Sequence, residues 1–169
     1  MVCEIDQSGK VEDTKKWTVV CFANGKIKTL LITAKEKRKA LLAMRAIDKP
    51  KRTFVFRIFA GLIFLLVQDE DIETIVIDEE YPEHEATIKF ILLTLFQKFH
   101  KKSPEIDFQR IGKKSMAHIK GIAVFRGETK PDIVVKAKDL FGLFNWTKKS
   151  PFMAVLLSAR RRRSCRHNP

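Results

Sequence analysis

The sequence predicts a single α/β domain: a three-stranded antiparallel meander, then alternating helices and strands, all in one mixed sheet. Three observations carry this prediction. Residues 1–33 alternate apolar and polar side chains between turn residues. Later apolar segments change from a spacing of two to helical spacing. A length of 169 residues and a hydrophobic share of 45% suit one domain with a sizeable core.

The meander is predicted from three short segments rich in β-branched and aromatic residues. Residues 2–6 alternate apolar and polar side chains, residues 17–23 suit a mostly buried strand, and residues 27–33 alternate again. Asn24 and Gly25 between the last two segments are a strong hairpin signal, because both residue types tolerate positive φ. Strand, turn, strand, Asn-Gly, strand is the order of an antiparallel meander.

The rest of the chain alternates helical and strand-like segments. Residues 34–47 carry apolar side chains at helical spacing, and residues 54–67 are apolar on nearly every side, which fits a buried helix. The second segment is too short to span a bilayer, since a span needs about twenty apolar residues, so no integral membrane span is expected. The later strands are expected at 73–78, 106–111 and 132–135, and the later helices at 82–100, 116–125 and 138–146.

Composition divides the chain into a domain and a tail. Residues 1–149 form the expected domain, and residues 150–169 form a basic tail, expected to be disordered from about residue 158. Its four consecutive arginines, Arg160–Arg163, suit phosphate binding, a targeting signal or a solvated terminus. Residues 1–10 are polar and acidic and contain no signal peptide, so a cytoplasmic location is expected.

The charge of the chain indicates polyanionic partners. Thirty-three Lys and Arg against twenty Asp and Glu give a formal net charge of +13. Such an excess favours nucleic acid first and an anionic membrane surface second. A basic surface without a partner is the alternative, because net charge indicates attraction and not recognition.

Several classes of site lack their sequence signature. The seven glycines are scattered and form no GxGxxG or GxxxxGKS phosphate loop. No GxSxG nucleophile elbow occurs. The three cysteines are far apart and lack a CxxC spacing, which argues against a zinc site or a disulfide framework and favours buried thiols for Cys3 and Cys21.

Two acidic residues end predicted strands. Asp6 closes the first strand in the stretch IDQSG, and Asp78 closes the later strand IVID. Together with the order of elements over about residues 1–146, this pair resembles the ribonuclease H-like superfamily, which includes ribonucleases H, Holliday-junction resolvases and transposase cores. The stretches Ile5–Glu12 and Ile111–His118 also resemble segments of small archaeal proteins with that fold.

The resemblance implies a metal-dependent nuclease or a related phosphoryl-transfer protein acting on nucleic acid. In that superfamily the first and fourth strands are neighbours, and each presents a catalytic carboxylate. Asp6, Asp78 and Glu79 would then bind Mg²⁺ or Mn²⁺, with Glu80 also near enough in sequence to be a ligand. The alternatives are that Asp6 only builds a turn and that the acids at 78–80 only favour a helix N-terminus.

The late part of the chain supplies further candidates. His118 is the expected catalytic histidine, because some members of the superfamily use a late histidine in proton transfer; a structural histidine is the alternative. Lys113, Lys114 and Ser115, with Arg110 before them, are expected to bind nucleic-acid phosphates through cations, a hydroxyl and a helix N-terminus. A solvated basic loop is the alternative for these residues.

The carboxylate set is incomplete against the pattern of the superfamily. Ribonucleases H usually place a Glu on the first long helix and an Asp near the last one. Here Glu36 lies at the beginning of its helix, and neither Asp132 nor Asp139 has a distinguishing context. A non-catalytic nucleic-acid-binding module on the same fold is therefore the second hypothesis. A membrane-surface protein anchored through residues 150–166 is the third.

Overall fold

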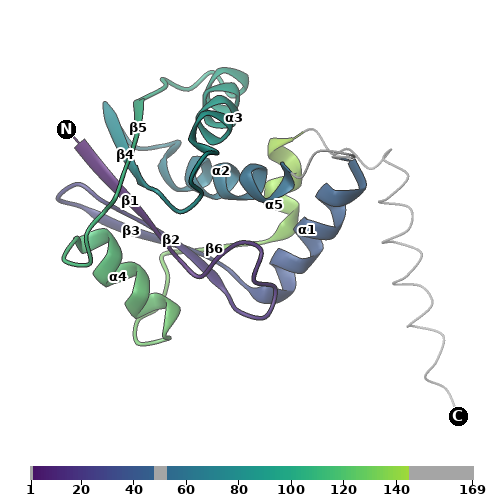
Figure 1. The fold of residues 1–169 in the computed structure, drawn as a ribbon, viewed down its shortest axis with the longest axis horizontal. Coiled ribbons are helices and arrows are strands. Elements are labelled where there is room, and N and C mark those ends of the chain that lie inside the picture. The colour runs from purple at the N-terminus through teal and green to yellow at the C-terminus, as the bar shows by residue number, and fades with distance from the viewer. Residues whose placement is uncertain (1, 48–52, 145–169) are drawn as a thin grey trace, which may run out of the picture.

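The structure, a computed structural model, describes residues 2–47 and 53–144 and has an α/β fold with one mixed sheet (Figure 1). The predicted basic tail and Arg160–Arg163 lie outside the described residues. The strands are β1 (Val2–Ser8), β2 (Thr18–Ala23), β3 (Ile27–Ile32), β4 (Thr74–Asp78), β5 (Glu105–Gln109) and β6 (Ile133–Val135). The helices are α1 (Ala34–Ile47), α2 (Phe54–Val67), α3 (Glu85–Lys98), α4 (Met116–Phe125) and α5 (Ala137–Leu143).

The predicted meander is confirmed at the centre of the sheet, whose strand order is β5-β4-β1-β2-β3-β6. β1 and β3 both pair antiparallel with β2. The hairpin between β2 and β3 has a three-residue loop, Asn24–Lys26, in which Gly25 adopts φ +89°. The outer pairs β1–β4, β4–β5 and β3–β6 are parallel, so the sheet is mixed, as predicted.

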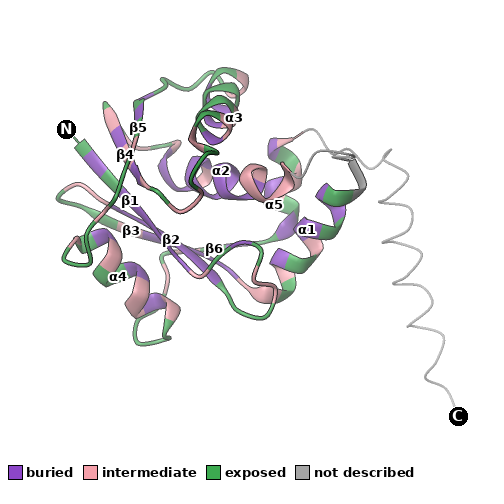
Figure 2. Cartoon of the chain, in the orientation of Figure 1, coloured by how far each residue is buried: buried purple, intermediate pink, exposed green. Residues whose placement is uncertain are grey.

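Helices cover the two faces of the sheet unequally (Figure 1). α4 packs on β1, β2 and β3 from one side, and the other described helices lie on the opposite side. α2 is apolar on nearly every side because the sheet, α1, α3 and α5 all contact it, and most of its residues are buried (Figure 2). Among the described residues, no helix has the length and apolar character needed to cross a membrane.

β1 carries side chains of opposite character to the two faces of the sheet. Cys3 and Ile5 are completely buried in the main hydrophobic core, as expected of alternating residues. Asp6 and Ser8 face α4, beside its Gly121. β1 runs to Ser8, two residues beyond the predicted end, so Asp6 lies inside the strand, paired with Cys21 of β2 and one residue after the last pair with β4.

The parallel pairing of β1 and β4 decides where their acidic residues lie. Ile5 is paired with Ile77, so Asp6 and Asp78 follow neighbouring positions of adjacent strands. Both strands run in the same direction, and their carboxyl ends therefore meet at one edge of the sheet. The thiols of Cys3 and Cys21, on β1 and β2, are free and buried, as the sequence predicted.

Candidate metal centre

Three carboxylates converge at the edge where β1 and β4 end. Asp6, Asp78 and Glu80 each offer an oxygen atom, and these atoms all lie within 4.8 Å of one another. Asp6 comes from β1, Asp78 is the last residue of β4, and Glu80 lies in the turn that follows. The backbone N–H of Glu80 donates to the carbonyl of Asp78 at 2.8 Å, which closes this turn.

Asp6 is the most constrained member of the cluster. Only 2% of its surface is exposed, and its Oδ1 lies 3.4 Å from Nδ1 of His118 on α4. Its Oδ2 is buried and has no hydrogen-bond partner among the described residues. Burial raises the pKa of Asp6 above its usual value; the charge of Asp78 adds to this, and His118 opposes it. A buried acceptor without a donor is unusual in a folded protein, and a proton, a water or a cation can each satisfy it.

Asp78 and Glu80 complete a cluster that cannot hold three negative charges without compensation. Asp78 Oδ1 accepts a hydrogen bond from the backbone N–H of Ile111 at 2.6 Å, which fixes its orientation. Burial, followed by the charges of Asp78 and Asp6, raises the pKa of Glu80 to about 7, while Lys10 lowers it. Like charges at this separation repel, and either protons or a cation must relieve the repulsion.

The donor set fits a hard divalent cation. All three side chains offer carboxylate oxygens, which Mg²⁺ and Mn²⁺ prefer, and no thiol belongs to the cluster. Acidic clusters alone do not establish a metal site. The buried, unpaired Oδ2 of Asp6 is the second observation, because a cation would satisfy an oxygen that no described residue does.

The structure separates the two acids that follow Asp78. Glu79 was expected as a ligand, but it is exposed, lies outside the cluster and forms an ion pair with Arg110 at 3.3 Å. Glu80, which the sequence also offered as a possible ligand, takes that place. The turn after β4 explains the difference, because the bond from the Glu80 N–H to the Asp78 carbonyl bends the chain so that Glu80 lies with Asp78 and Glu79 lies outside the cluster.

The predicted phosphate-binding residues lie around the start of α4. Lys113 and Lys114 are exposed in the loop between β5 and α4, and the Arg110 side chain is 92% exposed. Ser115 is the N-cap of α4, as predicted: its hydroxyl accepts from the N–H of Ala117 at 3.1 Å. The same hydroxyl donates to Glu4, so Ser115 is engaged in local structure.

The late carboxylates considered from the sequence bind elsewhere in the fold. Glu36 accepts from the N–H of Ala137 at 3.0 Å. Asp132 accepts from the N–H and hydroxyl of Thr29, each at 2.7 Å, and Asp139 caps α5. None of the three joins the cluster, so the described residues provide three acidic ligands and no fourth.

A polar network beside the cluster was not predicted. The fully buried side chain of Lys37, on α1, donates to the carbonyl of Lys10 at 2.9 Å and to Thr18 Oγ1 at 2.8 Å. The hydroxyl of Tyr81, next in sequence to Glu80, accepts from the N–H of Val11 at 3.3 Å. The available signal was spacing, because Lys37 precedes the buried Met44 by two helical turns on the same face of α1.

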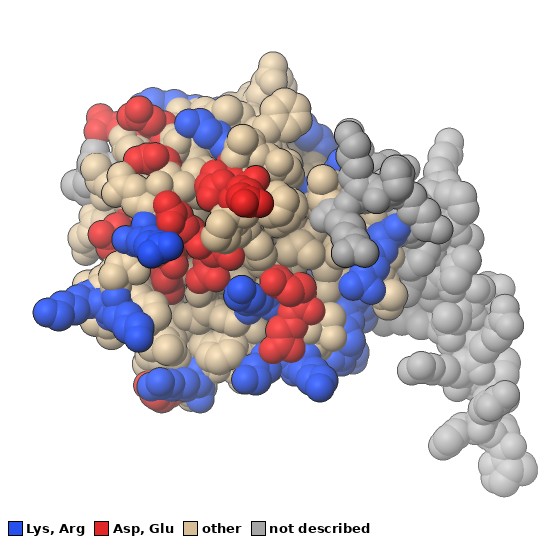
Figure 3. Space-filling view, in the orientation of Figure 1, with Lys and Arg blue, Asp and Glu red and all other residues tan. Residues whose placement is uncertain are grey.

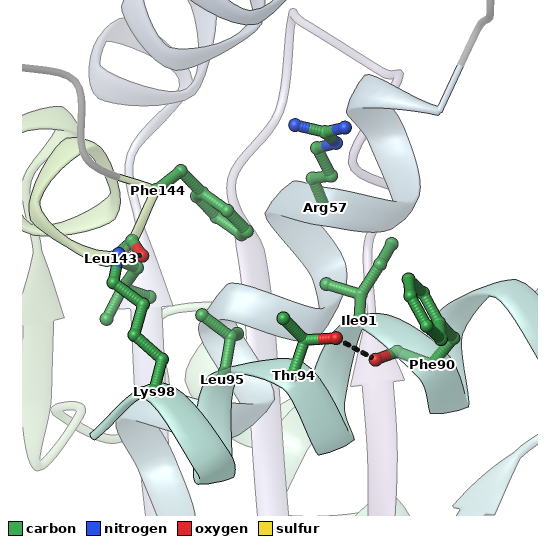
Figure 4. A pocket seen from close by; sticks show the side chains of 8 residues that line it. All are labelled: Arg57, Phe90, Ile91, Thr94, Leu95, Lys98, Leu143 and Phe144. Atoms are coloured by element: carbon green, nitrogen blue, oxygen red, sulfur yellow. Dashed lines mark hydrogen bonds between the residues drawn. The ribbon is translucent and has the colours of Figure 1, made fainter.

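The surface around the cluster has mixed charge. Acidic side chains gather near the middle of the face drawn in Figure 3, and lysine and arginine side chains lie around them. A separate apolar groove of about 220 Å³ lies between α3 and the end of α5, with Ile91, Leu95 and Phe144 among its lining residues (Figure 4). No member of the carboxylate cluster lines this groove, so it is not part of the candidate metal centre.

Comparison with known proteins assigns no family. A scan of the sequence against protein-family models gave no match, and a search among curated proteins gave none either. The geometry of the cluster and of the surface around it must therefore carry any functional argument.

Proposed function

We propose that this protein is a metal-dependent nuclease, or a related phosphoryl-transfer protein, of the ribonuclease H-like type. The observation that carries the proposal is the convergence of Asp6, Asp78 and Glu80 around an unpaired, buried carboxylate oxygen. Mg²⁺ or Mn²⁺ held there would supply Lewis-acid stabilisation of charge on a phosphodiester and activation of a water nucleophile.

The sheet topology supports the assignment to this type of fold. In the superfamily that the sequence resembles, the first and fourth strands are neighbours and present catalytic carboxylates. Here β1 and β4 are adjacent and parallel, the first three strands form the meander, and Asp6 and Asp78 lie on the two neighbouring strands.

The residues around the carboxylates have roles that fit this chemistry. His118 lies against Asp6, where it orients that carboxylate and provides a nitrogen for proton transfer. Arg110, Lys113 and Lys114 supply cations on the side of β5 and α4, where a phosphate backbone passing the cluster would be neutralised.

The test compares acids inside and outside the cluster. Asp6→Asn and Glu80→Gln should each reduce Mn²⁺ binding, measured by calorimetry, at least tenfold and remove Mn²⁺-dependent cleavage of labelled DNA and RNA. Glu79→Gln is the matched control, since Glu79 neighbours Asp78 but lies outside the cluster. Equal Mn²⁺ affinity in wild type and Asp6→Asn would refute the metal site.

A non-catalytic nucleic-acid-binding module is the second candidate. It is favoured by the engagement of Glu36, Asp132 and Asp139 elsewhere, which leaves the described residues without a fourth acidic ligand. This candidate predicts salt-sensitive binding of nucleic acid without turnover in Mg²⁺ or Mn²⁺. Any cleavage that depends on Asp6 excludes it.

A further inference from the structure

The loop that joins β1 and β2, residues 9–17, borders the carboxylate cluster and is held from two sides. Lys37, on α1, donates to the carbonyl of Lys10 at 2.9 Å, and Thr18 Oγ1 donates to the same carbonyl at 3.2 Å. From the other side, Tyr81 accepts from the N–H of Val11 and donates to Glu12 at 3.0 Å. The loop therefore has a defined shape beside Glu80, the residue before Tyr81.

Trp17 ends this loop with much of its indole in solvent. It is 43% exposed, although the residue after it is completely buried in β2. Tryptophan is enriched among the residues that contribute most to binding at interfaces, and this one stands on a well-anchored loop. The carbonyl oxygen of Trp17 packs closely against Gly9: a Cβ atom added to Gly9 would lie only 2.5 Å from it. This close contact holds the backbone of Trp17 in place.

Three lysines share the loop with this tryptophan, and the two acids of the loop accept hydrogen bonds. Lys10, Lys15 and Lys16 are exposed. Glu12 accepts from Tyr81, and Asp13 accepts from the N–H of Lys15 at 3.0 Å. The loop carries three cations and two anions, and its exposed lysines are the groups that suit a phosphate backbone.

The sheet register gives the separation between Trp17 and the cluster. Ser8 and Val19 are the last pair of β1 and β2, and extending that register places Trp17 level with Lys10, four residues beyond Asp6. At about 3.3 Å per residue this is about 13 Å. A stacked nucleic-acid strand covers that length in about four nucleotides, at about 3.4 Å per nucleotide.

We propose that the loop 9–17 binds a single-stranded nucleic acid, with an unpaired base stacked on Trp17 and phosphates on Lys10, Lys15 and Lys16, a few nucleotides from the carboxylate cluster. This proposal rests on the proposed function, which makes the carboxylate cluster a metal site. It adds that the nucleic acid bound beside that site is single-stranded. Stacking selects single strands, because the faces of bases in a duplex are covered by their neighbours.

The experiment measures binding without divalent metal, so that it is independent of catalysis. The chain has two tryptophans, and Trp146→Phe leaves Trp17 as the only tryptophan, whose fluorescence is excited selectively over that of Tyr81. Titration with a twelve-nucleotide oligothymidylate, its RNA counterpart and a duplex of equal length should quench this fluorescence with the single strands and not with the duplex. Trp17→Ala should weaken single-strand binding about tenfold, as expected for one stacked base, while Trp17→Phe retains most of it.

The outcomes separate this proposal from the proposed function. Single-strand binding that depends on Trp17, without cleavage in Mn²⁺, supports the loop and refutes the nuclease. Cleavage that depends on Asp6 and is unaffected by Trp17→Ala refutes the loop and leaves the nuclease. Duplex binding equal to single-strand binding also refutes the loop. Thermal unfolding of each variant shows whether a loss of binding is caused by misfolding. If Trp17→Ala is misfolded, the binding of Trp17→Phe tests the proposal in its place.

Discussion

The buried lysine on α1 gives the most quantitative prediction. Lys37 is completely buried, and burial lowers its pKa from 10.5 to about 8, although Asp13 and Glu12 oppose this. The charged form is therefore disfavoured in the fold by about 3 kcal/mol, at 1.36 kcal/mol per pH unit. Replacing Lys37 with Met removes this cost, but it also removes the donor to the carbonyl of Lys10 and to Thr18.

The sign of the pH effect follows from proton binding. Between about pH 8 and 10.5 the unfolded chain keeps the Lys37 proton and the folded chain loses it, so the free energy of unfolding rises with pH. Lys37→Met lacks this contribution. The stability of wild type relative to the variant should thus increase by up to about 3 kcal/mol over this interval and stay flat below pH 8. The buried thiols of Cys3 and Cys21 are present in both proteins, and their effects cancel in the difference.

Urea denaturation at intervals from pH 7 to 10.5 measures this difference directly. Lys35→Met is the matched control, because it removes a lysine that is exposed on the same helix. Parallel stability curves for wild type and Lys37→Met would refute the reasoning, since they would mean that the ammonium group is not desolvated.

Two further predictions concern the cluster and the loop beside it. Because the pKa of Glu80 is raised to about 7, Mn²⁺ affinity should fall about tenfold per unit below pH 7 as the carboxyl gains its proton, and calorimetry from pH 8 to 5.5 measures this fall. An affinity that does not change with pH would contradict it. Gly9→Ala should destabilise the fold by about 2–4 kcal/mol, because Gly9 has φ +79° and an added Cβ would meet Phe125 and the carbonyl of Trp17. Gly25→Ala, at φ +89° with open space around it, should cost only the backbone strain of about 1 kcal/mol, and denaturation of both variants compares the two.

The elements of the fold could be predicted because each has a local cause. A few neighbouring residues are enough to predict each of three features: the Asn24-Gly25 turn, the alternation in β1 and the apolar spacing of α1. The pairing of β1 with β4 is different, because about seventy residues separate the two strands and no local pattern specifies their contact. Only the resemblance implied that pairing in advance.

The site was harder to predict than the fold, because it depends on the geometry of a turn and on the burial of single side chains. Asp78 could be found because it ends an apolar strand, but the choice between Glu79 and Glu80 depends on how the chain turns after β4. The geometry of that turn directs Glu79 towards Arg110 and Glu80 towards Asp6. Lys37 was missed because its spacing to Met44 places it on the inner face of α1, but a lysine at such a position usually extends its ammonium group to solvent.

The position of Asp6 argues against the simplest alternative, that it only builds a turn. Turn-building aspartates bind their own backbone in exposed loops. Asp6 instead lies within β1, paired with Cys21 of β2, and is almost completely buried under α4. Pairing with β2 holds its backbone, and its Oδ2 is buried without a partner among the described residues. That cost can be offset by a proton on the carboxyl or by a cation shared with Asp78 and Glu80. If a cation binds there, Mn²⁺ should raise the free energy of unfolding at neutral pH; if a proton satisfies the oxygen, Mn²⁺ should leave it unchanged.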